Sequence, residues 1–297
     1  MSADSAVDRR LEEIRLTRRV RWVLYGLLSA GFLGIFYASL MAIEFHFVDV
    51  VREVPDFLDT LPHYAPNWEV LVEDGFHLPR EAGITLALGI VGTVLGFPLA
   101  LLLGVLGSGR VTPFPFNFIF RSIMGTSRAI PALLWFLIFI PLTGLSPVTG
   151  AIAIAVSTIG NLGRLFTDEL EEIKDGPIEA MQTTGASKTQ IVIFGMLSQV
   201  RTSFIAWTLY IFEINVRVAV TLGLLNAGGI GQFILVQQDL RNFSDMMAGI
   251  LVVLVLIIVV EMLSQRIRSY LRAEDEAEGL IQLIVSFPTR MAESALK

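Results

Sequence analysis

The chain has 297 residues, of which 54% are hydrophobic and 17% are charged, and it contains no cysteine. Without cysteine, disulfides and cysteine-based metal or redox sites are excluded, and the formal net charge of −6 argues against general nucleic-acid binding. Apolar runs of about 20 residues recur along the chain, which is the length that a helix needs to cross a bilayer core. We therefore expect an all-α, polytopic membrane protein.

Six membrane spans are expected, and the third and fourth are short or interrupted. Spans of that kind pack inside protein, because irregular backbone is not tolerated against lipid. The third span is expected to begin as early as residue 114. The polar N-terminal stretch is longer than the basic region of a usual signal peptide, so the first span is expected to be retained. The spans lie at residues 22–43, 82–106, 129–143, 147–166, 191–216 and 246–263.

Arginine placement orients these spans in a cell membrane. Arginine clusters precede the first span, separate the second from the third and follow the sixth, whereas the loop after the first span is acidic. Short basic loops stay on the cytoplasmic side, so both termini are expected in the cytoplasm. The expected organisation is a cytoplasmic segment at 1–21, the first span with an acidic external loop at 22–79, a core at 80–272 and a cytoplasmic tail at 273–297, with an interfacial helix at 280–285.

Two further patterns concern packing and metals. Gly92 and Gly96 make a small-xxx-small pair, which predicts close helix–helix approach in the second span. The three histidines, His46, His63 and His77, all fall in the external loop. Scattered loop histidines rather than a metal site are the interpretation that we adopt, so no metal ligand is assigned.

The segment between the fourth and fifth spans begins as a short helix. Pro177 suits the first helical position, with Asp175 or Gly176 as the N-cap and Glu179 in the first turn, where a negative charge favours the helix dipole. The prediction is a helix of about two turns on the cytoplasmic side.

A glycine turn and a second helix follow. Gly185 is placed to end the first helix in a left-handed conformation, and Ser187 with Gln190 fits a capping box that opens the next helix, which runs into the fifth span. A rigid helical hairpin carried by two spans could receive mechanical force from a motor protein in the cytoplasm. An ordinary inter-helix loop is the alternative that these residues leave open.

The same segment resembles the Glu-Ala-Ala loop of ABC importer permeases, in which Glu-Ala-Ala-x-x-x-Gly is followed further on by Ile-x-Leu-Pro. At matching positions Met181, Gly195 and Ser198 replace the second Ala, the Ile and the Pro. In that family this loop is the coupling helix, which docks in a groove of the ATPase subunit. The resemblance rests on Glu179, Ala180, Gly185 and Leu197, and it implies ATPase-coupling roles for Gly176, Pro177, Glu179, Ala180, Gly185 and Ser187.

Other stretches resemble the phosphonate-type branch of these permeases. The likeness runs from about residue 80 to 270 and implies a type I ABC importer permease fold. It also implies a permease for phosphonates or related phosphorus oxyanions (phosphite, phosphate). Its partners would be a second permease subunit, two ATPase subunits that bind ATP and magnesium, and an extracytoplasmic solute-binding protein. No phosphate-loop pattern occurs, so no cofactor is expected in this subunit. The stretches are 128–131, 157–163, 176–180, 212–217 and 227–232.

The fifth span carries charges. Glu213 and Arg217 are four residues apart on one helix face and are expected to form an ion pair, while Asn215 lies on another face. Ionisable groups within a span mark either a transport pathway or a structural pair, and both interpretations stay open. An arginine suits an oxyanion route because its guanidinium binds such groups in a bidentate way.

Three glycines, Gly228, Gly229 and Gly231, follow the fifth span. A plain turn is the simplest interpretation. We expect a tight re-entrant segment near the axis of a dimer, at the outer mouth.

A secondary transporter or channel for small anions, driven by ion gradients, is the main alternative. It would need intramembrane acids and often a repeat of spans, whereas Glu213 is the only acid placed well within a span. An intramembrane enzyme is disfavoured because no histidine lies in a span.

Overall fold

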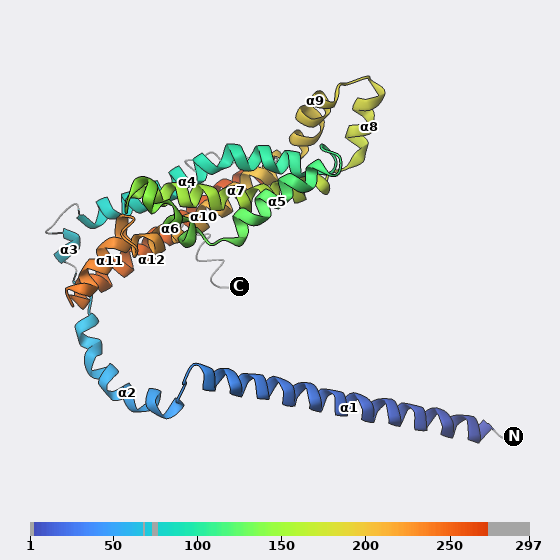
Figure 1. Ribbon diagram of the computed structural model, residues 1–297, viewed down its shortest axis with the longest axis horizontal. Helices are drawn as coiled ribbons and strands as arrows, with labels where there is room; N and C mark the ends of the chain where they lie inside the picture. Colours follow the sequence, from blue (N-terminus) through green and yellow to red (C-terminus); the bar gives the residue numbers. More distant parts are fainter. Residues whose placement is uncertain (1–2, 68, 73–76, 273–297) are drawn as a thin grey trace. The chain divides into compact units, whose positions relative to one another are not determined.

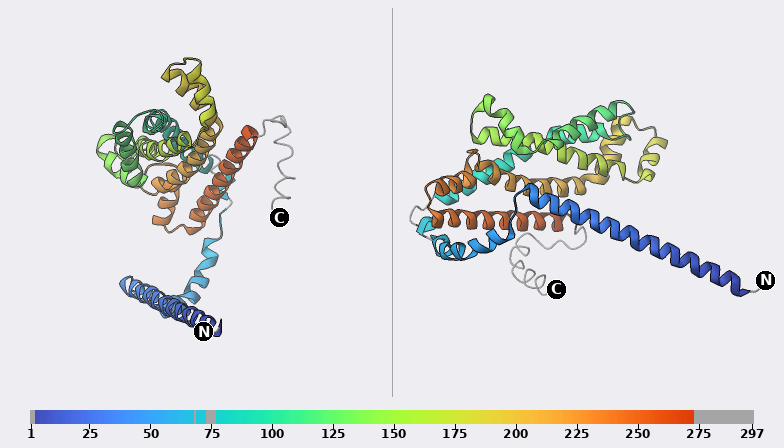
Figure 2. Two further views of the ribbon diagram at one scale, coloured as in Figure 1. Left: turned by 90° about the vertical axis from the view of Figure 1, so that its right-hand side faces the viewer. Right: turned by 60° about the horizontal axis from the view of Figure 1, so that its bottom comes forward.

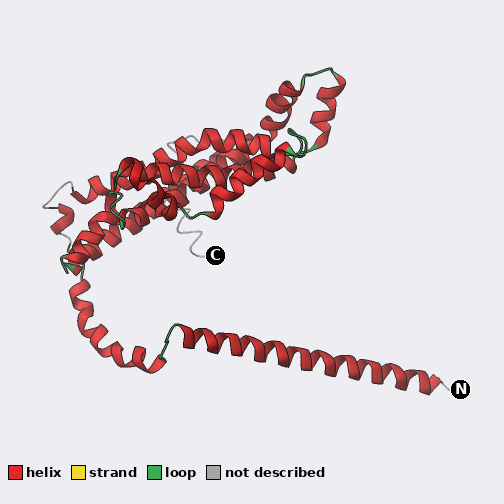
Figure 3. Cartoon of the chain, viewed as in Figure 1, coloured by secondary structure: helices red, strands yellow, loops and turns green. Residues whose placement is uncertain are grey.

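The computed structural model describes residues 3–67, 69–72 and 77–272, and these ranges are helical with no strand (Figures 1 and 3). The expected all-α class is confirmed. The expected tail at 273–297 and its interfacial helix lie outside the described residues. The chain divides into two units, residues 1–62 and 63–297.

The first unit contains two helices, α1 (Ala3–Ala42) and α2 (Phe47–Thr60), and a 3-10 turn, η1 (Leu61–Tyr64), lies at its boundary. The stretch Val20–Ala42 of α1 is long and apolar enough to cross a membrane, as expected for the first span. The helix also continues without a break through most of the expected cytoplasmic segment.

The second unit is a bundle of helices. Its elements in chain order are α3 (Glu69–Val72), α4 (His77–Gly107), α5 (Phe116–Ala129), α6 (Ala132–Thr143), α7 (Pro147–Glu171), α8 (Asp175–Thr183), α9 (Lys188–Gln190), the π-helix η2 (Ile191–Met196), α10 (Leu197–Gly223), α11 (Gly229–Asp239) and α12 (Phe243–Arg272).

Among the described residues, five helices are long and apolar enough to cross a membrane, and α5 with α6 adds a sixth if that bent pair is one span. The six expected spans therefore correspond to helices, and several of these helices are longer than expected. The fourth continues to Glu171, and the fifth runs from Lys188 to Gly223 as α9, η2 and α10.

Helix α7 is the centre of the bundle, where it packs against α4, α5, α6 and α10. A Cβ atom added to Gly92 would lie 2.4 Å from Ile154 Cγ2, and one added to Gly96 would lie 2.6 Å from the Ala155 oxygen. No other residue fits these positions without a shift, so the close approach predicted for the glycine pair is confirmed, with α7 as the partner.

Aromatic rings fill the space between α7 and its neighbours. The ring of Phe166 is fully buried, stacks on Phe204 with centroids 4.0 Å apart, and meets the edge of Phe97 at 5.9 Å. These contacts join α4, α7 and α10 into one apolar core.

The third span is interrupted at Pro131, where α5 and α6 meet at 91°. Proline has no N–H, so in a continuous helix it would leave the carbonyl of Ser127 without its donor. The indole nitrogen of Trp135 takes that place and donates to the Ser127 oxygen at 3.2 Å, while the Ser127 hydroxyl donates to the Val156 oxygen on α7 at 2.5 Å. The break is therefore fixed against α7, whereas most other side chains of α5 and α6 are exposed or only partly buried, so packing of this span inside protein stays a prediction.

Candidate functional site

Helices α8 and α9 form a hairpin that projects from one end of the bundle (Figures 1 and 2). Lys174 is the N-cap of α8, so the predicted cap at Asp175 or Gly176 is wrong, and Pro177 is the third helical residue rather than the first. The first N–H groups of a helix have no partner within it, so proline costs no hydrogen bond at the third position either. The predicted start of the helix is two residues too late, because several positions in the first turn tolerate proline equally.

The turn of the hairpin has the predicted geometry. Gly185 has φ +77°, and its N–H donates to the Gln182 oxygen at 3.1 Å. The Ser187 N–H donates to Gln190 Oε1 at 2.8 Å, and the Gln190 N–H donates to Ser187 Oγ at 3.4 Å. The left-handed glycine and the capping box are confirmed, and together they fix the angle between α8 and α9.

Helix α8 has an anchored side and a free side. Ile178 packs on the apolar core, and Met181 Sδ lies 2.9 Å from the position of a Cβ atom at Gly195, so a larger residue there would push the methionine away. Glu179 and Ala180 are exposed. The hairpin therefore holds its two motif residues outward on a base that is fixed to the start of the fifth span.

A cluster of charges, which the sequence analysis missed, ties the base of α8 to the loop after α4. The Arg110 guanidinium donates to the Glu171 backbone oxygen at 2.9 and 3.1 Å and pairs with Asp175, the first residue of α8. Arg121 pairs with the Glu171 carboxylate and donates to the Gly107 oxygen at 2.7 Å.

The predicted ion pair between Glu213 and Arg217 is wrong. Glu213 Oε1 lies 2.7 Å from Arg268 Nη2, and Arg217 Nη2 donates to Glu261 Oε2 at 3.3 Å. Both new partners belong to α12, which packs along α10 and offers each charge a partner of opposite sign. Glu261 lies within a candidate span, so Glu213 is not the only acid there.

Asn215 is buried at the junction of three helices. Its side-chain nitrogen donates to Thr93 Oγ1 on α4 and to Thr158 Oγ1 on α7, both at 2.8 Å. Each threonine hydroxyl donates in turn to its own helix, to the oxygens of Gly89 and Ile154. The side chain of Asn215 is thus a structural link between α10, α4 and α7.

Arg217 and its partner Glu261 are half exposed, at 46% and 44% of their side-chain surface. Both residues belong to candidate spans, and a charged pair within a span is not expected to face lipid tails, because a charge in hydrocarbon is costly. The pair therefore faces either water or another protein surface. Of the three polar residues predicted on α10, Arg217 is the one with a side chain open enough to meet a solute.

A polar strip lies on α7, and the sequence analysis did not identify it. The strip consists of Ser157, Asn161, Arg164 and Asp168, whose spacing places them along one side of a helix. Asn161 donates to the Ser157 oxygen at 3.0 Å, and Arg164 Nε donates to Asp168 Oδ2 at 3.0 Å, with both charged side chains about two-fifths exposed (41% and 42%). The signal that could have revealed it is the helical spacing of four polar residues in an apolar span.

The glycines after the fifth span form a turn that opens α11. Gly228 and Gly229 have φ +92° and +76°, conformations that favour glycine, and a Cβ atom at Gly231 would lie 2.0 Å from the Val220 oxygen. The Ile230 N–H donates to Thr85 Oγ1 at 2.9 Å. The turn lets α11 pack tightly against α10 and α4, and a role at a dimer axis stays a prediction.

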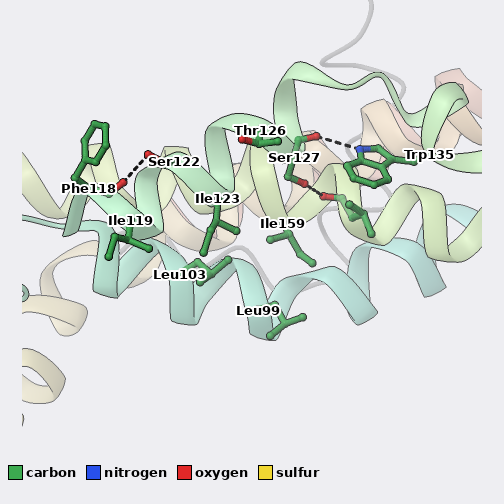
Figure 4. Close-up of a pocket in the computed structure, with 11 residues that line it drawn as sticks. Leu99, Leu103, Phe118, Ile119, Ser122, Ile123, Thr126, Ser127, Trp135 and Ile159 are labelled. Carbon is green, nitrogen blue, oxygen red and sulfur yellow. Dashed lines mark hydrogen bonds between the residues drawn. The ribbon is translucent and has the colours of Figure 1, made fainter. Parts of the chain in front are cut away.

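An apolar pocket of about 670 Å³ lies beside the broken span (Figure 4). Its walls carry no charged residue, and the hydroxyls of Ser122 and Ser127 already donate to the oxygens of Phe118 and Val156. Thr126 adds one further hydroxyl to the lining, and a single neutral donor does not supply the several donors that an oxyanion needs, so the pocket does not suit one.

Residues 78–273 match the family model described as the inner membrane component of binding-protein-dependent transport systems. A putative phosphite transport system permease protein, HtxC of Stutzerimonas stutzeri, is 33% identical over 201 residues, which cover 67% of this chain and 71% of the relative. The phosphate-import permease protein PhnE of Mycolicibacterium smegmatis is 33% identical over 207 residues, 69% of this chain and 38% of the relative. The fold is similar to that of a chain in inward-facing structures of the MetNI methionine ABC transporter, with a TM-score of 0.61 and 22% identity over 67% of this chain and 98% of that chain. The chain therefore belongs to the family of inner membrane components of binding-protein-dependent transport systems.

Proposed function

We propose that this chain is the membrane-spanning permease subunit of an ATP-driven ABC importer for phosphonates or related phosphorus oxyanions. The names of its relatives support the substrate class, since they include phosphite, phosphate-import and phosphonate permeases. The observation that carries the proposal is the capped hairpin of α8 and α9, which presents Glu179 and Ala180 outward from a fixed base.

The subunit would work with three kinds of partner. Two permease chains would form the translocation unit, two ATPase subunits would bind ATP and magnesium and dock on the hairpins, and an extracytoplasmic solute-binding protein would deliver the oxyanion. Both termini would lie in the cytoplasm, as the arginine distribution indicates. The permease itself would make and break no covalent bond.

The charge cluster supports a path for the mechanical signal. A displacement of α8 would move Asp175 and, through its ion pair with Arg110, the loop that joins α4 to α5. Arg121 and Glu171 would carry the same displacement into α5 and α7. The broken span formed by α5 and α6 would then shift with the hairpin rather than independently of it.

The oxyanion route would follow the half-exposed Arg217–Glu261 pair and the polar strip on α7. Each of these two sites contains one arginine paired with one carboxylate, so an arriving oxyanion could exchange with the carboxylate and bind the guanidinium. Such exchange keeps each guanidinium paired while the solute passes, and the displaced carboxylate, which is less than half exposed in both pairs, is left to interact with water. Glu213 and Asn215, which are buried within the subunit, would hold the helices that carry this route.

The test is ATP-dependent uptake by the complex of permease, ATPase and binding protein in vesicles. Radiolabelled phosphite, methylphosphonate and phosphate would be compared with methionine. We expect uptake of at least one phosphorus compound only when ATP is supplied on the ATPase side. Uptake driven by an ion gradient without ATP would favour the secondary transporter, and uptake of methionine alone would reject the substrate class.

A further inference from the structure

Helix α2 (Phe47–Thr60) has two chemically opposite faces, and it lies outside the residues that match the family model. At about 3.6 residues per turn, residues spaced three, four, seven, ten and eleven positions from the first share one face. The apolar face consists of Phe47, Val50, Val51, Val54, Phe57 and Leu58. The polar face has the same spacing and consists of Asp49, Arg52, Glu53, Asp56, Asp59 and Thr60.

The turn before α2 ends α1 sharply. Glu44 has φ +52°, the Phe45 N–H donates to the Leu40 oxygen at 3.0 Å, and the Glu44 N–H donates to the Met41 oxygen at 3.1 Å. These two bonds with a left-handed residue form a Schellman motif, in which the chain leaves the helix axis. The candidate span therefore stops at this turn and does not continue outward as a rod into solvent.

The short link also limits where α2 can begin. Helix α1 ends at Ala42 and α2 begins at Phe47, and an extended chain covers at most about 3.6 Å per residue, or roughly 18 Å here. The first residue of α2 therefore lies close to the place where the candidate span leaves the membrane. No residue of α2 is buried, so the described part of the chain leaves the apolar face of this helix exposed.

We infer that α2 lies flat in the membrane–water interface, with its apolar face among the lipid acyl chains and its polar face toward water. The polar face carries four carboxylates and a single guanidinium and no lysine, so attraction to anionic headgroups cannot hold it there. Burial of the apolar face must supply the binding, which makes zwitterionic lipid a sufficient partner. In this orientation the four carboxylates of the polar face stay hydrated.

The absence of cysteine allows a direct test with single-cysteine variants of the full chain. Nitroxide labels would be placed at Val50, Val54 and Leu58 on the apolar face and at Glu53 and Asp56 on the polar face, in phosphatidylcholine vesicles. Collision with oxygen, which concentrates in the bilayer, would be compared with collision with a water-soluble nickel chelate. A label at Leu33, within the candidate span, calibrates the lipid signal.

We expect the oxygen-to-nickel ratio to be severalfold higher at the apolar positions than at the polar ones, alternating with the helical period. Added phosphatidylglycerol should not raise that difference. High nickel access at all positions would overturn the inference, because the helix would then lie in water. Apolar positions protected from both reagents would also overturn it, because a second copy or another part of the chain would then cover the face.

Discussion

Glu213 on α10 lies 2.7 Å from Arg268 on α12, and both side chains are largely withdrawn from solvent, at 7% and 20% exposure. Removing one member of a buried ion pair costs about 3–5 kcal/mol, because the other charge is left without a partner, whereas replacing both members costs less. We expect Arg268→Gln to lower membrane abundance and the thermal unfolding midpoint, and Glu213→Gln with Arg268→Gln to recover most of both. Equal losses in the single and double variants would contradict a pair interaction.

The hairpin prediction concerns coupling. Reversing the charge at the exposed Glu179 changes helix-dipole energy by about 1 kcal/mol at most, which is too little to unfold the subunit. We expect Glu179→Arg to abolish uptake while membrane abundance stays unchanged. Glu172→Arg, a charge reversal at an exposed residue just before the hairpin, is the matched control and should retain uptake. Normal uptake by Glu179→Arg would remove the hairpin from the mechanism.

The charge cluster beside the hairpin gives a second coupling prediction. The Asp175 side chain is 70% exposed, so loss of its pair with Arg110 costs about 1 kcal/mol or less in stability. We expect Asp175→Asn and Arg110→Gln to lower the number of solutes imported per ATP hydrolysed, with the arginine variant more affected because Arg110 also binds the Glu171 oxygen. An unchanged ratio of uptake to hydrolysis in both variants would leave the cluster a purely structural role.

The Asn215 link predicts a stability effect without a transport effect. Hydrogen bonds between membrane helices contribute about 0.6 kcal/mol each on average, so losing both bonds to Thr93 and Thr158 should cost roughly 1 kcal/mol. We expect Asn215→Leu to lower the unfolding midpoint and to leave uptake per folded molecule unchanged. A variant that folds normally but transports poorly would instead assign Asn215 to the route.

Arg217 is the residue of α10 that is expected to meet the solute. Its side chain is 46% exposed, so Arg217→Gln should disturb folding less than Arg268→Gln does. We expect a loss of uptake of about tenfold or more, which corresponds to about 1.4 kcal/mol or more of lost interaction with the oxyanion. Arg217→Lys should retain part of the uptake, because it keeps the charge without the bidentate geometry. Similar uptake by Arg217→Gln and wild type would exclude this arginine from the route.

The sequence by itself determined the features that arise from neighbouring residues. The capping box of Ser187 and Gln190 and the left-handed Gly185 depend on bonds across a few positions, so residue types and spacing suffice to predict them. The spans follow from the length of apolar runs, and the approach at Gly92 and Gly96 follows from the lack of side chains. The cap of α8 was misplaced because several positions in a first helical turn accept proline.

Only the tertiary structure decided which charges meet. Glu213 and Arg217 satisfy the spacing rule for a pair on one helix, yet each binds a residue of α12 that is far away in sequence. The same holds for Arg110 with Asp175 and for Asn215 with its two threonines. Such partners depend on how each helix is rotated and how far it is displaced along its neighbour. Those two quantities are set by the summed packing of many side chains, such as Phe166 against Phe204, and no local pattern encodes them.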